Sequence, residues 1–203
     1  MKMGRFEKLF VNSERHALRV IDRAEKLLAF VDMGGKRDLL EVGCGAGAAS
    51  LHIAEKYSLY VTGVDIDPGQ ISLARWKANG ASNVRFSEAD ATALPFGDSE
   101  FDIVMTQNVL HHVHDWLHAL DEMNRVLRPG GYLVYSDLVY HEWAAKLRSS
   151  RIGARLARAY GFPTAAGLND FAARNGFATV HSVPSAKHLV IFNEYHAVYR
   201  KPS

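Results

Sequence analysis

The chain has 203 residues, a length that suits one domain with a substantial hydrophobic core. Its 48% hydrophobic and 23% charged residues are typical of a globular protein and exclude a disordered or fibrous chain. Lysine and arginine total 24 against 22 acidic residues, so the net charge of +2 gives no overall basic surface for nucleic acid. We therefore expect no nucleic-acid partner.

Cysteine use and hydropathy indicate the compartment. The single cysteine, Cys44, cannot form an intramolecular disulfide, and no stretch approaches the roughly 18 apolar residues of a membrane span. The first residues carry scattered charges where a signal peptide needs an apolar core. We expect a cytoplasmic protein without an integral membrane segment.

Short apolar runs alternate with segments of helical spacing. A helix over 13–33 is predicted first, followed by strands at 38–42, 60–65, 84–87, 101–106 and 132–136. Asp67 and Asp115 are predicted to cap two of the intervening helices. This order predicts a parallel sheet with helices on both faces. Two last strands, 177–183 and 189–199, are joined by a link too short for a parallel crossover, so we expect them to be antiparallel.

A glycine-rich loop follows the first predicted strand, where residues 41–47 read Glu-Val-Gly-Cys-Gly-Ala-Gly. Glycines there allow a sharp turn and a close approach to a ligand. Gly43, Gly45 and Ala48 also satisfy the dinucleotide pattern, which alone is not specific. Glu41 favours S-adenosylmethionine, because a carboxylate would repel a pyrophosphate but suits an ammonium and a sulfonium. The alternative for Glu41 is a salt bridge with a lysine.

The loop resembles the first motif of class I S-adenosylmethionine-dependent methyltransferases. Further matches follow in the family's order at 63–67, 87–96, 101–113 and 125–131. The resemblance implies a Rossmann-like α/β fold in a single domain over 1–203, with a doubly wound, seven-stranded, mostly parallel sheet and an antiparallel last strand. The closest similarity is to the small-molecule branch that includes ubiquinone and menaquinone C-methyltransferases.

The same resemblance implies a cofactor site. Asp65 would bind both ribose hydroxyls, Asp90 would accept from the adenine amino group, and the amide of Ala91 would reach a ring nitrogen. The predicted S-adenosylmethionine-binding residues are Glu41, Gly43, Cys44, Gly45, Gly47, Asp65, Ile66, Asp90, Ala91 and Gln107.

Histidines crowd the segment after the fourth predicted strand. His111 and His112 are the predicted catalytic residues, because a neutral imidazole can take a proton from a hydroxyl or an amine. A loop-shaping role for either histidine is the alternative. His114 and His118 have i, i+4 spacing, but without a cysteine or an HExxH frame we expect no metal.

A basic stripe follows the fifth predicted strand. Arg148, Arg151, Arg155 and Arg158 lie within a predicted helical substrate lid over about 138–167. An anionic substrate, peripheral contact with a membrane surface that carries a lipid quinone, or tRNA would each suit this stripe, and a solvated helix face is the alternative.

The predicted function is transfer of the S-adenosylmethionine methyl group to an oxygen, nitrogen or carbon of a small molecule, with a homodimer left open. The alternatives are an NAD(P)-dependent Rossmann oxidoreductase and a non-catalytic S-adenosylmethionine-binding protein.

Overall fold

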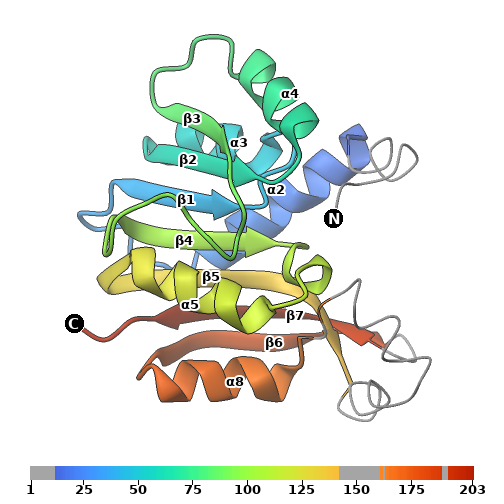
Figure 1. Cartoon of the computed structure of the whole chain (residues 1–203), viewed down its shortest axis with the longest axis vertical. Helices are drawn as coiled ribbons and strands as arrows, with labels where there is room; N and C mark the ends of the chain where they lie inside the picture. Colours follow the sequence, from blue (N-terminus) through green and yellow to red (C-terminus); the bar gives the residue numbers. More distant parts are fainter. Residues whose placement is uncertain (1–11, 142–160, 162, 189–191) are drawn as a thin grey trace.

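The computed structural model describes residues 12–141, 161, 163–188 and 192–203. Their strands form one seven-stranded sheet in the order β3-β2-β1-β4-β5-β7-β6 (Figure 1). The strands are β1 (Asp38–Val42), β2 (Tyr60–Asp65), β3 (Val84–Glu88), β4 (Phe101–Gln107), β5 (Leu127–Tyr140), β6 (Ala178–His188) and β7 (Phe192–Arg200). Strands β1 to β5 are parallel, and β7 runs antiparallel to both β5 and β6. The predicted fold, with its antiparallel last strand, is confirmed.

The helices are α2 (Glu14–Leu28), α3 (Ala48–Tyr57), α4 (Pro68–Ala78), the 3-10 turn η1 (Leu110–His112), α5 (Trp116–Val126) and α8 (Ala165–Arg174). Side chains cap the first backbone amides of helices α2, α4, α5 and α8. Asp67 accepts from the amide of Gly69, and Asp115 accepts from the amide of His118, so both predicted caps are confirmed.

The first helix is shorter than predicted. It begins as expected after Ser13 but ends at Leu28, because the amides of Phe30 and Val31 form tighter turns to the carbonyls three residues earlier. The Phe30 ring then stacks on His181 of β6, with ring centroids 3.8 Å apart.

Two further differences concern the second half of the chain. Strand β5 runs from 127 to 140 instead of 132–136, because β4 pairs with it at Leu127 and β7 pairs with it as far as Tyr140. Helix α8 was not predicted. Of the expected lid over 138–167, the structure describes only 138–141, 161 and 163–167, so the arginine stripe at 148–158 lies outside the described residues.

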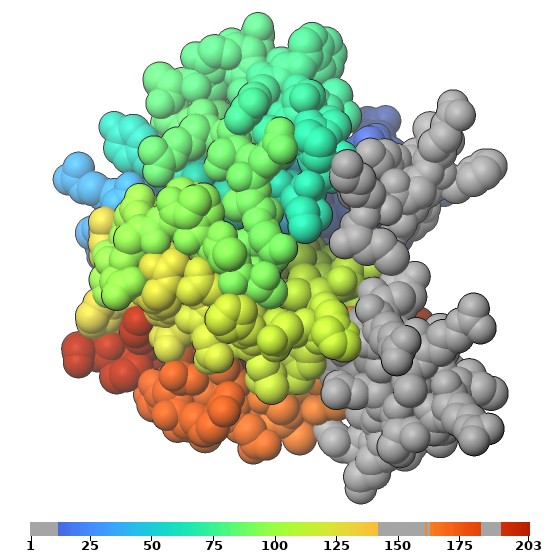
Figure 2. Space-filling model, in the orientation of Figure 1, coloured from blue at the N-terminus to red at the C-terminus, as the bar shows by residue number. Residues whose placement is uncertain are grey.

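The sheet separates two large hydrophobic cores, and a third, smaller cluster is formed by Cys44, Ile71, Ala74 and Phe86. Successive residues of one strand enter opposite cores, as Leu39 and Leu40 of β1 do, because side chains alternate across a strand. Helices α2 and α3 cover one face, and α5 and α8 cover the other (Figure 1). Figure 2 shows α5 and α8 on the outside of the second core. No helix in the described part of the chain is long and apolar enough to cross a membrane.

Candidate cofactor and active site

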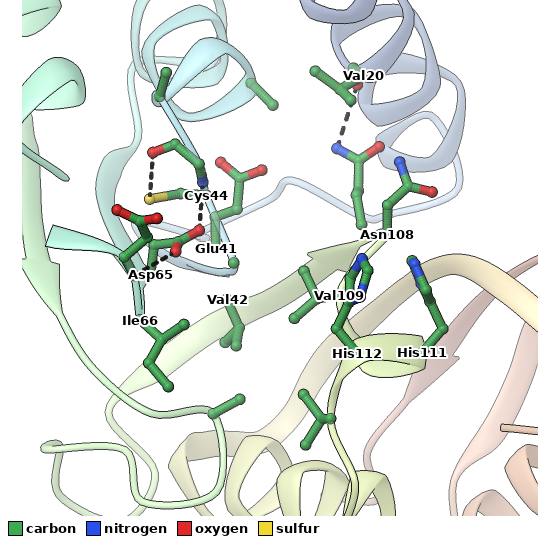
Figure 3. A pocket seen from close by; sticks show the side chains of 18 of the residues that line it. Val20, Glu41, Val42, Cys44, Asp65, Ile66, Asn108, Val109, His111 and His112 are labelled. Atoms are coloured by element: carbon green, nitrogen blue, oxygen red, sulfur yellow. Dashed lines mark hydrogen bonds between the residues drawn. The ribbon is translucent and has the colours of Figure 1, made fainter. Parts of the chain in front are cut away.

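A cavity of about 960 Å³ opens at the carboxyl ends of the parallel strands (Figure 3). Its walls come from the segments that follow β1, β2, β3 and β4, with further side chains from α2, β5 and β7. The parallel sheet places these loops at one edge, which is where ligands of open α/β sheets bind. Every predicted site residue lines this cavity except Gly47.

The glycines of residues 43–47 are required by contacts within the protein. Gly43, Gly45 and Gly47 all have positive φ, the left-handed conformation that glycine adopts most readily. A Cβ on Gly43 would lie 2.0 Å from Val109 Cγ2, and one on Gly47 would lie 2.6 Å from the Phe86 ring. Gly47 therefore packs the start of α3 against β3 instead of lining the cavity.

Glu41 is a buried carboxyl group at the base of the loop, only 4% exposed. It accepts a hydrogen bond from the Ser50 hydroxyl of α3. Burial raises the pKa of Glu41 to about 7, against the opposing effect of the Ser50 hydrogen bonds. The partner of Glu41 among the described residues is thus a serine and not the lysine of the alternative reading.

Asp65 ties the glycine loop to the end of β2. Its Oδ2 accepts from the amide of Gly45 and its Oδ1 accepts from the amide of Asp67, both at 2.9 Å. Burial raises the pKa of Asp65, and the two backbone hydrogen bonds oppose that rise. Each carboxylate oxygen has a second lone pair that can accept from a ligand. Ile66, 49% exposed, follows at the cavity wall.

Asp90 and Ala91 line the part of the cavity formed by the loop after β3. Asp90 Oδ1 accepts from the amide and the hydroxyl of Thr92, at 2.9 and 2.7 Å. These hydrogen bonds lower the pKa of Asp90, which is therefore ionised at neutral pH. Cys44 and Ala91 are buried beneath the cavity surface.

His111 forms a hydrogen-bonded pair with Asp137. Its Nδ1 lies 2.5 Å from Asp137 Oδ1, and the Asp137 side chain is fully buried. A carboxylate can only accept, so Nδ1 carries the proton and Nε2 is the basic nitrogen of the ring. The ring of His112 lies beside that of His111, with centroids 3.9 Å apart. Figure 3 shows both imidazoles on the same side of the cavity as Asn108.

Helix α2 contributes the guanidinium group of Arg23 to the cavity wall. Arg23 Nη1 donates to Asn108 Oδ1 at 3.1 Å, and Nη2 donates to Glu194 Oε1 of β7 at 3.0 Å. Gln107, the last residue of β4, donates from Nε2 to the Val20 carbonyl of the same helix. Helix α2, the end of β4 and strand β7 thus meet at this wall of the cavity.

Sequence reasoning missed Asp137, Arg23, Asn108 and Glu194. A signal existed for Asp137, because it directly follows the predicted strand 132–136 and so belongs to the same sheet edge as Asp65. No comparable signal existed for Arg23 and Glu194, which come together only through the packing of α2 against β7.

The donor set fits the expected cofactor. Glu41, Asp65 and Asp90 give the wall beside β1 to β3 an acidic character, which suits a ligand with an ammonium and a sulfonium and opposes a pyrophosphate. Among the described residues, no group of three or more histidine, cysteine, aspartate or glutamate side chains could hold a metal ion.

Comparisons with known proteins agree with this geometry. A family of proteins described as a methyltransferase domain matches residues 40–135. The chain is 36% identical over 129 residues to 27-O-demethylrifamycin SV methyltransferase of Amycolatopsis mediterranei, covering 62% of this chain and 46% of that protein. It is 33% identical over 145 residues to ajmaline N-methyltransferase of Rauvolfia serpentina, covering 66% and 50%. The chain thus spans about half the length of the curated relatives it matches.

Among solved structures, the PH0226 protein from Pyrococcus horikoshii OT3 superposes with a TM-score of 0.76 and 23% identity, covering 98% of this chain and all of that one. This likeness extends over the sheet and its helices and supports the fold. The matched domain and the relatives are those of methyltransferases, and the fold agrees with the S-adenosylmethionine-dependent methyltransferases that the sequence resembles.

Proposed function

We propose that the protein transfers the methyl group of S-adenosylmethionine to a hydroxyl or amine of a small molecule. One observation carries this proposal: the basic nitrogen of His111, oriented by Asp137, belongs to the same cavity as the acidic wall that fits the cofactor. The cavity volume of about 960 Å³ lies at the upper end of the usual range for ligand sites, which suits a cofactor together with an acceptor.

The cofactor residues are assigned by charge and position. Glu41 pairs with the ammonium of the methionine portion, and Asp65 accepts from the two ribose hydroxyls with its remaining lone pairs. Asp90, ionised and partly exposed, accepts from the adenine amino group. Cys44, Gly43, Gly45, Ile66, Ala91 and Gln107 shape the surface between these groups.

When bound, S-adenosylmethionine supplies a methyl group already activated by a positively charged sulfur. The protein then needs to hold the acceptor in line with that methyl group and to take the proton that the acceptor loses. His111 Nε2 is the group that takes this proton. Asp137 stabilises the imidazolium that results, because its carboxylate lies against Nδ1.

The relatives support a small acceptor. Their names describe methylation at an oxygen of a rifamycin and at a nitrogen of ajmaline. A hydroxyl or an amine gives His111 a proton to accept directly, so these acceptors suit the site better than the quinone carbon that the sequence resemblance implies.

Two measurements test the proposal. Calorimetry should show binding of S-adenosylmethionine and S-adenosylhomocysteine and no binding of NAD or NADP. A screen of hydroxyl and amine compounds with a labelled methyl donor should then yield a labelled product. Binding of NAD in preference to S-adenosylmethionine would indicate the oxidoreductase. Cofactor binding without transfer to any acceptor would indicate the non-catalytic binding protein.

A further inference from the structure

The cation of Arg23 is held in a fixed position at the wall of the cavity. Its side chain is 18% exposed, and its two hydrogen bonds come from different terminal nitrogens to different partners, Asn108 and Glu194. Arginine has five N–H donors, and the described part of the chain shows no other hydrogen bond of Arg23. Donors of a preoriented guanidinium therefore remain for a ligand.

Arg23 affects the pKa of His196 more strongly than its partner Glu194 does. Burial lowers the pKa of His196, and the next largest cause is Arg23, which outweighs the opposing effect of Glu194. Burial also lowers the pKa of His16, and Arg19 and Arg23 lower it further. At both histidines Arg23 therefore disfavours a second positive charge, although Glu194 neutralises part of the cation.

Side chains of both signs line the cavity, and the arginines lie on a different element from the predicted cofactor-binding carboxylates. The acidic side chains Glu41, Asp65 and Asp90 lie on the segments after β1, β2 and β3. Arg19 and Arg23 line the cavity from α2, and the histidines 111, 112 and 114 line it from the segment after β4. The carboxylates of Asp115 and Glu194 also line this side. A cationic cofactor occupies the first side under the proposed function, so the second side is left for the acceptor.

We propose that Arg23, positioned by Asn108 and Glu194, is a specificity-determining residue that binds a carboxylate of the methyl acceptor. This inference rests on the proposed function, because it assigns the acidic side of the cavity to the cofactor. The planar guanidinium matches the two oxygens of a carboxylate in geometry as well as in charge. The acceptor class is then a small carboxylic acid that also carries the hydroxyl or amine to be methylated.

The test uses the full chain saturated with S-adenosylhomocysteine, so that only the second side of the cavity is open. Calorimetry compares benzoate with two probes of similar size, neutral benzamide and cationic benzylammonium. We expect benzoate to bind at least about tenfold more tightly than benzamide, which corresponds to about 1.4 kcal/mol. Binding of S-adenosylhomocysteine is measured first and separately, so a failure of the proposed function is seen there.

Variants assign the binding to Arg23. Arg23→Gln should weaken benzoate binding at least about tenfold and leave the affinity for S-adenosylhomocysteine unchanged. Arg15→Gln is the matched control, because Arg15 is an exposed arginine of the same helix that does not line the cavity. Glu194→Gln should strengthen benzoate binding, because it removes a competing negative charge.

Three results would overturn the inference: equal binding of benzoate and benzamide, absence of saturable benzoate binding, or unchanged benzoate binding in Arg23→Gln. If benzylammonium binds more tightly than benzoate, and Glu194→Gln removes this preference, the acceptor that binds at this wall is a cation instead. Circular dichroism of each variant shows whether the fold is retained. If Arg23→Gln fails to fold, Arg23→Lys replaces it, because lysine keeps the positive charge but lacks the planar guanidinium group.

Discussion

The carboxylate of Asp137 is hydrogen-bonded to both the ring and the backbone amide of His111. Its Oδ1 contacts the imidazole Nδ1 at 2.5 Å, while Oδ2 accepts from the amides of His111 and Val109 at 3.2 and 3.0 Å. The loop after β4 and the orientation of the proposed base are therefore fixed by one buried side chain. A fourth hydrogen bond comes from the amide of Leu138.

We predict that Asp137→Asn lowers the turnover number by about 10²- to 10⁴-fold, the usual contribution of general base catalysis. Asparagine retains an oxygen acceptor for the loop but cannot stabilise an imidazolium. The measurement is labelled methyl transfer to an acceptor found in the screen, with calorimetry of S-adenosylhomocysteine on the same protein. Asp121→Asn, an exposed position on α5, is the control. Unchanged turnover in a folded Asp137→Asn protein would remove His111 from its role as the base.

Asp65 gives the sharpest test of the cofactor site. We predict that Asp65→Asn weakens S-adenosylmethionine binding by about 1.5 to 3 kcal/mol, the range for hydrogen bonds that involve a charged group. Asparagine is preferred to alanine, because Asp65 also accepts from the amides of Gly45 and Asp67. Calorimetry measures the affinity, and Asp170→Asn on the exposed face of α8 is the control. Wild-type affinity in Asp65→Asn would show that the ribose is bound elsewhere.

The cavity walls after β1 and β2 could be predicted from the sequence because they depend on local rules. The strand before Gly43, the strand that ends at Asp65 and the cap at Asp67 each have a signal within a few residues. Parallel order then places their carboxyl ends together without further information.

The acceptor side could not be predicted, because it depends on contacts between distant segments. Arg23 and Glu194 are 171 positions apart and meet only when α2 packs on β7. The end of helix α2 could not be predicted from the sequence either. Apolar spacing continues beyond Leu28, but the helix ends there, and the Phe30 ring stacks on His181 of β6. Helical periodicity alone carries no signal for such a contact.

Gly43→Ala is predicted to destabilise the protein through two separable effects. The new Cβ would lie 2.0 Å from Val109 Cγ2, and φ at this position is +77°. Overpacking costs about 1 to 3 kcal/mol, and a non-glycine residue in the left-handed region costs about 1 to 2 kcal/mol. Urea unfolding should therefore show a loss of about 2 to 5 kcal/mol in the free energy of unfolding.

Gly80→Ala separates the two effects. Gly80 has φ of +81°, but no atom lies within 4 Å of the Cβ position, so this variant should show only the conformational cost. Val109→Ala removes the clashing methyl groups and should restore part of the stability lost in Gly43→Ala. Equal losses in Gly43→Ala and Gly80→Ala would mean that Val109 moves aside without cost.

Glu41 is predicted to make both cofactor binding and stability depend on pH near neutrality. Its pKa is about 7 in the free protein because the carboxyl group is buried. An ammonium beside it favours the ionised form, so the affinity for S-adenosylmethionine should rise as the pH increases through about 7. Calorimetry of wild type, Glu41→Gln and Glu88→Gln across this range tests the assignment. Glu88 is exposed at the end of β3 and does not line the cavity.

Stability should change with pH in the opposite direction. The folded-state pKa of Glu41 is raised above its ordinary value of 4.5, so the folded protein binds more protons than the unfolded chain between these two values. The contribution of Glu41 to the free energy of unfolding is therefore fully present below about pH 4.5 and is lost as the pH rises through about 7. Glutamine resembles the protonated form at every pH, so Glu41→Gln should gain stability relative to wild type above pH 7 while it loses cofactor affinity there. A Glu41→Gln protein with the same pH profiles as wild type, for both urea unfolding and cofactor binding, would show that the carboxyl group does not titrate in this range and does not face the ammonium.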